Sequence, residues 1–428
     1  MPQTTEAACL LQSGSMFPAR IGFRDGSGEE VFVGIKDAGF SVYFGDAPIY
    51  HFDLDGRWQR AFIGGVHYLK GLDSTVRSVD RPREGGALAL RRRTMDHAEA
   101  SILDGDIRDM ALRVLSDLAV EVELTRPPPS ARMIGPEELR ELLGRAAAWD
   151  GAAWLAHRER YRSTYGPWPF LPPDCLNAVV LQATQGHAGG RAFAGAGAVP
   201  HRVRSPEEFE EHARAVAGIL GRRLPRSREV FLGGADVLRL PVDVVLGTLK
   251  AIATIFPAAV QSVEAGGPGT VHAFLDDFSP PLPSPDGWRR LRDAHLGRVT
   301  LGVESGSRAV RADHGRPWEN EALRATALDL KAAGIGVGVV ALVGAGGRAM
   351  AEAHLESTAG LIGSLGLGPG DLVSLVDSRA FTRSSGGPPP LSDEETAAQL
   401  SGLKRRLVAA PPSKGPRVVA YNPDNHRT

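Results

Sequence analysis

The stretch AVVLQAT (residues 178–184) is a continuous, mainly apolar run, as expected of a strand that is buried on both faces. A helix is predicted to follow at the capping-box sequence SPEE, which begins at Ser205. Apolar residues at helical spacing mark the buried face of this helix, and they are Phe209, Ala213, Val216 and Leu220. A doubly buried strand followed by an amphipathic helix is typical of a parallel β/α sheet.

The same alternation continues toward the C-terminus. One further strand is predicted near residues 260–264, and a helix is predicted to end at Gly334, a residue type common just after helices. The other predicted strands are EVFLGG, RVTLGV, GVGVVALVG, LVSLVDS and RVVAY. Six or seven βα units in a row predict a parallel sheet. At this length, a curved partial or complete barrel is favoured over a flat doubly wound sheet.

The N-terminal third has a different pattern. Short runs rich in Val, Ile, Phe and Tyr, such as EEVFVGI and GFSVYFG, predict antiparallel strands, and Asp55-Gly56 is a strong hairpin signal. A helix is predicted from about Asp96 to Asp117, and another opens at Pro136 and runs towards Tyr165. The predicted boundaries are a tail over 1–19, an α+β domain over 20–124, a linker and connecting helix over 125–165, and a barrel over 166–428.

Composition narrows the classes of function. The 428 residues carry a net charge of −1, which calls for neither nucleic acid nor an anionic membrane. The two cysteines, Cys9 and Cys175, exclude a disulfide framework and any site that needs three thiolates. No apolar run reaches the ~18 residues of a membrane span, and the first residues lack the features of a secretion signal. We therefore expect a cytoplasmic protein that acts on small molecules, with a homodimer left open.

Several strings in order carry a family resemblance. YGPWPFLPPD precedes the first barrel strand, HRVRSPEE follows it, and then come FLGGADVLRLP, LGVESG and AAGIGVGVVALVGAGGR. Together with the N-terminal string IYHFDLDGRWQRAFIGGVHYLKGLD, they resemble a bacterial branch of the radical S-adenosylmethionine (SAM) superfamily that has an N-terminal β domain. The resemblance implies an α/β fold: a radical-SAM-like, TIM-type β/α barrel, partial or complete, preceded by a small antiparallel α+β domain.

The chain departs from that family where three cysteines hold an iron–sulfur cluster. Here the loop reads GHAGGRAFAGAG, which places His187, Arg191 and Ala194 at the three cysteine positions. Such a cluster needs thiolates, and an imidazole, a guanidinium and a methyl group cannot replace them. We expect a divergent member without the cluster; an active radical enzyme with unusual ligands is another hypothesis. His187 is a candidate for proton transfer, with a hydrogen bond to the backbone as the alternative.

The resemblance places a SAM site at the carboxyl ends of the strands. The amides of Gly233-Gly234 and the carboxylate of Asp236 suit the methionine end of SAM, whereas Glu304-Ser305 suit the ribose or the sulfonium. The alternatives are a turn cap for Asp236, a helix cap for Ser305, barrel packing for Leu342 and Val343, and a surface pair for Arg379. The catalytic candidates are His187, Asp236 and Glu304. The SAM-binding candidates are Gly233, Gly234, Asp236, Glu264, Glu304, Ser305, Leu342, Val343 and Arg379.

The favoured function is that of a SAM-dependent lyase or transferase without a four-iron cluster. Polar attack at a carbon beside the sulfonium gives methyl transfer, aminocarboxypropyl transfer, or closure to 1-aminocyclopropane-1-carboxylate with release of methylthioadenosine. SAM is then a substrate or co-substrate in specialised metabolism. The sequence shows no pyridoxal phosphate (PLP) motif around its lysines and no metal-binding motif. The alternative is a pseudoenzyme that serves as a partner-binding subunit.

Overall fold

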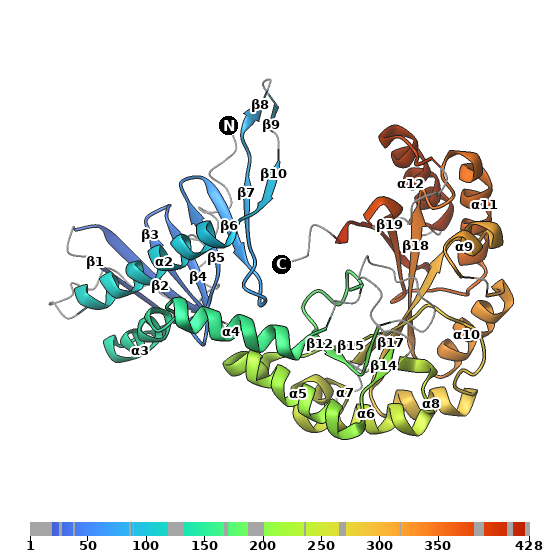
Figure 1. Ribbon diagram of the computed structural model, residues 1–428, viewed down its shortest axis with the longest axis horizontal. Helices are drawn as coiled ribbons and strands as arrows, with labels where there is room; N and C mark the ends of the chain where they lie inside the picture. The colour runs from blue at the N-terminus through green and yellow to red at the C-terminus, as the bar shows by residue number, and fades with distance from the viewer. Residues whose placement is uncertain are drawn as a thin grey trace. The chain divides into compact units, whose positions relative to one another are not determined.

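The computed structural model divides the chain into two compact units. The first holds the residues up to Thr164 together with Ile219–Arg226, and the second holds Tyr165–Gly218 and Ser227–Arg427 (Figure 1). The structure describes residues 19–24, 28–36, 39–84, 87–88, 90–118, 132–166, 170–186, 201–234, 237–264, 271–316, 318–380, 389–408 and 414–423.

The first unit is built on a nine-stranded sheet in the order β10-β7-β6-β5-β4-β3-β2-β1-β11. Neighbours from β1 to β7 pair antiparallel, and only β11 joins in parallel. The strands are β1 (Ala19–Arg24), β2 (Glu30–Lys36), β3 (Gly39–Phe44), β4 (Ile49–Asp53), β5 (Trp58–Ile63), β6 (Val66–Lys70), β7 (Val76–Asp80), β10 (Arg91–Thr94) and β11 (Arg132–Met133). A short hairpin of β8 (Arg83–Glu84) and β9 (Ala87–Leu88) stands apart from this sheet.

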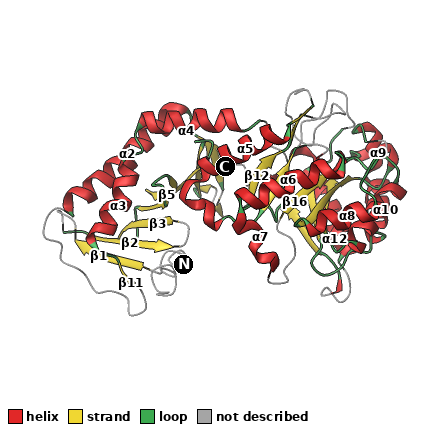
Figure 2. Ribbon diagram, turned by 90° about the horizontal axis from the view of Figure 1, so that it is seen from below, coloured by secondary structure: helices red, strands yellow, loops and turns green. Residues whose placement is uncertain are grey.

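Three helices cover the sheet of the first unit (Figure 2): α2 (His97–Asp117), α3 (Pro136–Ala147) and α4 (Gly151–Thr164). Val33 of the sheet shares one apolar core with Ile107 of α2 and Leu143 of α3. The single helix predicted from Pro136 towards Tyr165 is wrong, because it is two helices. The side chain of Asp150 accepts a hydrogen bond from the Ala153 amide (2.9 Å) and so starts a new helix after α3 has ended.

The second unit is an α/β structure with a seven-stranded parallel sheet in the order β12-β15-β16-β17-β18-β19-β20. The strands are β12 (Val179–Gln182), β15 (Val230–Gly233), β16 (Val271–Leu275), β17 (Leu296–Glu304), β18 (Gly336–Val343), β19 (Leu372–Asp377) and β20 (Arg417–Tyr421). The helices are α5 (Pro206–Leu220), α6 (Val242–Ile255), α7 (Pro257–Glu264), α8 (Pro285–Asp293), α9 (Arg308–Asp313), α10 (Asn320–Ala332), α11 (Ala351–Gly363) and α12 (Asp393–Leu407). The predicted α/β fold, with an antiparallel domain before a parallel sheet, is confirmed.

The third predicted strand lies in the wrong place. Residues 260–264 belong to helix α7, and the strand is β16, further along the chain. Pro257 occupies the first position of α7, where a missing amide hydrogen costs nothing, so the apolar residues after it continue as a helix. Glu264 therefore ends a helix and not a strand.

The two edge strands of the parallel sheet, β12 and β20, do not pair with each other in the part of the chain that the structure describes. The segment before β12 contacts β20 instead, since the Tyr421 hydroxyl donates to the Leu171 carbonyl (2.8 Å) and Phe170 meets the Tyr421 ring edge-on. Phe170 and Tyr421 share an apolar cluster with Val340, Leu342 and Val376. We call the carboxyl ends of these strands the barrel mouth.

None of the helices in the described part of the chain combines the length and the apolar composition of a membrane span.

Candidate functional site

Two carboxylates and one guanidinium meet at the barrel mouth. Asp276 comes directly after β16, Glu304 is the last residue of β17, and Arg316 reaches both from the loop beyond α9. The Arg316 Nε donates to Glu304 Oε1 (3.2 Å), and its Nη2 donates to Asp276 Oδ2. All three residues are buried. The Arg316 guanidinium thus lies between two buried carboxylates, and the nearby Arg311 cation also acts on Glu304.

The backbone at Glu304 is strained. Its φ angle is +57°, in the left-handed region that favours glycine, and the pairing of β17 with β18 shifts register between Gly302 and Glu304. The Ser305 amide donates to the Val303 carbonyl (2.5 Å), which closes a three-residue turn around Glu304. Such strain persists only where neighbours hold it, and it is concentrated at functional sites.

The Glu304 carboxyl titrates near neutral pH. Burial raises its pKa from 4.5 to about 7; the cation of Arg316 opposes the rise, and the charge of Asp276 adds to it. Its Oε2 atom is buried and has no hydrogen-bond partner among the described residues. A buried carboxyl with one unused oxygen and a pKa near 7 is suited to exchange a proton or to accept a cationic group.

A buried hydrogen-bond chain holds the turn at Glu304 in place. His354 of α11 donates from Nε2 to the Leu342 carbonyl (2.7 Å), so its Nδ1 accepts the Ser305 hydroxyl proton (2.8 Å). The same hydroxyl oxygen accepts a hydrogen bond from the Ser307 amide (3.0 Å). Burial lowers the pKa of His354 to about 4, which keeps the imidazole neutral. The Ser305 hydroxyl is therefore engaged within the protein and positions its neighbour.

Glycines permit close backbone approach at two points of the barrel mouth. A Cβ at Gly306 would lie 2.0 Å from the Ser357 carbonyl oxygen of α11, and a Cβ at Gly234 would lie 2.5 Å from the Thr184 carbonyl oxygen. Gly234 also has a φ of +103°. Gly306 of the string LGVESG and Gly234 of FLGGADVLRLP thus have packing roles in this fold.

The remaining predicted site residues lie on strands of the parallel sheet or at the surface. Gly233 ends β15; Leu342 and Val343 are buried in β18, and Leu342 belongs to the apolar cluster of the barrel. The Arg379 side chain is 43% exposed and binds the carboxylates of Asp377 (2.6 Å) and Asp393 (2.6 Å). Arg379 thus forms the surface pair that was the alternative to a ligand contact.

Some predicted site residues, or their side chains, are not among those that the structure describes. His187, Arg191, Ala194 and Asp236 lie outside the described residues, as does the side chain of Glu264. Their proposed roles stay predictions.

Sequence reasoning did not identify Asp276, Arg316 or His354. The signal for Asp276 was present, since it directly follows the run VHAFL, but the strand had been placed too early in the chain. Arg316 and His354 lie in segments with no motif, and only folding brings them to β17.

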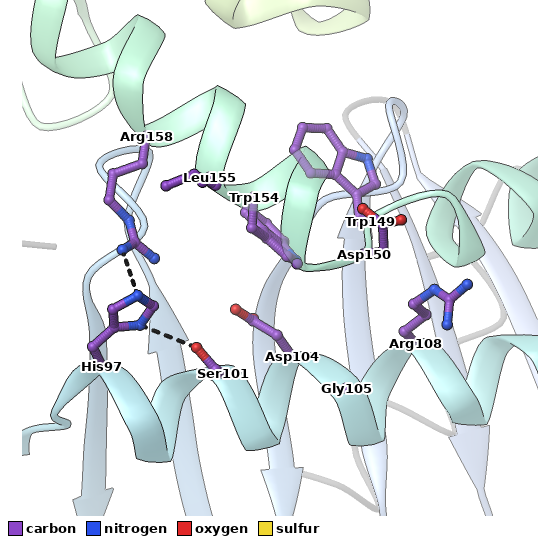
Figure 3. A pocket seen from close by; sticks show the side chains of 11 residues that line it. His97, Ser101, Asp104, Gly105, Arg108, Trp149, Asp150, Trp154, Leu155 and Arg158 are labelled. Carbon is purple, nitrogen blue, oxygen red and sulfur yellow. Dashed lines mark hydrogen bonds between the residues drawn. The ribbon is translucent and has the colours of Figure 1, made fainter.

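The first unit contains a pocket of about 280 Å³, which lies between α2 and α4 (Figure 3). Asp104 lines it and accepts hydrogen bonds from Trp58 Nε1 (2.7 Å) and Lys70 Nζ (2.5 Å). His97 lies between Ser101 (3.0 Å) and Arg158 (3.1 Å). Because these polar groups already have partners within the protein, we place the candidate site at the barrel mouth.

The fold and the site together define an α/β protein with a buried carboxylate–arginine cluster at the carboxyl ends of its parallel strands. No family model and no curated protein matches the chain. Among solved structures it is similar to TsrM, a radical S-adenosylmethionine methyltransferase from Kitasatospora setae with cobalamin and a [4Fe-4S] cluster bound (12% identity, TM-score 0.34, 50% of this chain and 38% of that one). The chain thus spans less than two thirds of the length of TsrM.

Two further solved structures are similar over larger shares of their chains. HydG, a maturase of the [FeFe]-hydrogenase, matches at 15% identity and a TM-score of 0.38, over 76% of this chain and 71% of its own. Methylornithine synthase PylB matches at 11% identity and a TM-score of 0.35, over 57% of this chain and 72% of its own.

Proposed function

We propose that this protein is a SAM-binding enzyme that carries out polar chemistry at the SAM sulfonium without an iron–sulfur cluster. The observation that carries the proposal is Glu304, a buried carboxyl with a strained backbone, a raised pKa and an unpartnered oxygen at the barrel mouth. The retained string LGVESG, in which Glu304 lies, links this carboxyl to the SAM site of the family that the sequence resembles.

The residues do not fit a four-iron cluster. Its ligands are thiolates, and the 428 residues include two cysteines. Cys175 is buried before the start of β12, at the end of the strand opposite the barrel mouth. The proposed reaction therefore involves no iron–sulfur cluster.

The residues do fit a cationic ligand. SAM carries a sulfonium group, and a buried carboxylate with an unpartnered oxygen favours such a cation. Arg316 holds Oε1 of Glu304, so Oε2 is the atom left for a cation or a proton. Ser305 and His354 keep the turn, and with it the carboxylate, in one orientation.

When bound, SAM supplies a sulfonium that activates its three adjacent carbons toward displacement. Glu304 has two roles in this proposal: its ionised form offsets the positive charge, and near its pKa it takes up or releases a proton. Arg316 pairs with Asp276 as well as with Glu304 and so holds the two carboxylates side by side. Methyl transfer, aminocarboxypropyl transfer and internal cyclisation all fit these roles.

Calorimetry tests the proposal with SAM and with S-adenosylhomocysteine, which keeps the ammonium group but lacks the sulfonium charge. The wild-type protein is expected to prefer SAM, and the preference is expected to grow as the pH rises through about 7, because the carboxylate form of Glu304 binds the cation. E304Q should lose about tenfold or more of the affinity for SAM and little of that for the analogue. The exposed variant E321Q is the matched control.

The absence of SAM binding by heat and by thermal shift would refute the proposal. Mass spectrometry after incubation with SAM, in air and without oxygen, then identifies the reaction. Adenosylhomocysteine indicates methyl transfer, and methylthioadenosine indicates the other two outcomes. Binding without any product would favour the pseudoenzyme, a partner-binding subunit, over the enzyme.

A further inference from the structure

A second group of chemically reactive side chains lies in the second unit, away from the barrel mouth. Asp174 and Cys175 precede β12, and His272 is the second residue of β16. One potential ligand atom from each residue lies within 4.8 Å of the others: a carboxylate oxygen, the Sγ atom and an imidazole nitrogen. Because Cys175 and His272 lie at the amino ends of parallel strands, this group is at the sheet end opposite Glu304.

The three side chains are incompletely satisfied by the protein. Nδ1 of His272 is buried and has no hydrogen-bond partner among the described residues. Cys175 is fully buried, and its Sγ has one weak contact, with Asp174 Oδ1 (3.9 Å). Arg298 binds the other carboxylate oxygen of Asp174 (2.5 Å), which leaves Oδ1 facing the thiol. Three ligand atoms with unused capacity therefore face one another.

We propose that Asp174, Cys175 and His272 form a metal-binding site for Zn²⁺ or a similar thiophilic divalent cation. Thiolate, imidazole and carboxylate are the ligands that zinc takes in proteins, and three of them leave a fourth position for water. A hard cation such as Mg²⁺ is excluded as the preferred occupant, since two of the three ligands are sulfur and nitrogen.

The charges around the group agree with a divalent occupant. A thiol binds a metal ion as the thiolate, so metal binding displaces one proton from the Sγ atom of Cys175 to solvent. Arg298 pairs with Asp174, and the Glu229 carboxylate acts electrostatically on Cys175. With these two residues included, the thiolate, two carboxylates, the guanidinium and Zn²⁺ sum to zero charge.

The site is tested with the full chain and with metal ions alone. The protein is stripped with a chelator and then titrated with Zn²⁺ in a calorimeter, and in parallel with Co²⁺ in a spectrophotometer. The expected result is one equivalent bound, together with the near-ultraviolet charge-transfer absorption that a cobalt–thiolate bond produces. C175S should abolish that absorption, and H272Q should weaken Zn²⁺ binding tenfold or more, about the effect of losing a ligand or its support.

The matched control is C9S, which removes the chain's other cysteine and should leave the absorption unchanged. Circular dichroism of each variant establishes that it is folded. Binding of equal strength in the wild type, C175S and H272Q would overturn the proposal, and so would cobalt absorption that disappears in C9S. Neither readout depends on SAM, so the metal site and the proposed function stand or fall separately.

Discussion

Glu304 shows how one residue combines the features of a functional site. Its carboxyl is buried, its backbone has a φ of +57°, and its pKa lies near 7. None of these is favourable for stability by itself. The hydrogen bonds around Ser305 and the ion pair with Arg316 keep the residue in this state.

The raised pKa of Glu304 makes a prediction about stability. Because the native carboxyl binds its proton more tightly than the unfolded one, its contribution is fully present below pH 4.5 and is lost as the pH rises through about 7. The loss is up to about 3 kcal/mol. E304Q should lack this fall, as measured by urea unfolding across the window. An unchanged pH profile in E304Q would show that Glu304 titrates normally.

His354 should act in the opposite direction. Its pKa is lowered from 6.5 to about 4, so the unfolded state binds the proton more tightly, and stability is lost as the pH falls through that window. H354Q should remove this acid-side loss and leave the fall due to Glu304 more visible in urea unfolding. If H354Q and wild type show parallel profiles, the buried imidazole is not neutral in the native state.

At the level of elements, the turn after β17 is set by its contact with α11. Gly306 Cα approaches the α11 backbone at Ser357 so closely that a side chain would overlap it, and the Gly306 amide donates to Thr358 Oγ1 (2.9 Å). This contact fixes where the strand ends and hence where Glu304 lies.

Two glycine substitutions separate this contact from helix propensity. G306A places a Cβ 2.0 Å from a carbonyl oxygen and should cost about 2 kcal/mol or more. G360A, in the last turn of α11 with open space around it, should instead stabilise the protein by about 0.5–1 kcal/mol. Thermal unfolding of both variants checks the pair. A neutral G306A would mean that the turn and α11 are not in contact.

Elements were predictable where the local signal was strong. The capping box at Ser205 and Pro136 marked helix starts correctly, and Asp55-Gly56 marked a true hairpin between β4 and β5. The third barrel strand was misplaced because a short apolar run is compatible with either a helix or a strand. That error concealed Asp276, and so half of the carboxylate pair.

At the level of the whole molecule, the two units have separate apolar cores. One includes Val33 and Leu143, and the other includes Val340 and Leu342. Units with their own cores are expected to unfold as separate cooperative transitions.

Calorimetric unfolding should therefore show two transitions. L143A, in the core of the first unit, should lower one of them, and L301A, in β17 of the second, should lower the other; each should cost about 2–5 kcal/mol. A single transition that shifts equally in both variants would show that the units unfold as one.

The sequence by itself determined the class of fold, with an antiparallel and a parallel sheet, and the shortage of cysteines, because these follow from local patterning and from counting. The sequence also identified Glu304 as a candidate site residue, because the string that carries the resemblance, LGVESG, is continuous in the chain. Only the tertiary structure decided that Arg316 and Asp276 share its charge, that His354 holds the Ser305 hydroxyl, and that Asp174, Cys175 and His272 converge. Such groups are far apart along the chain, and their pKa values depend on burial and neighbours that no local pattern encodes.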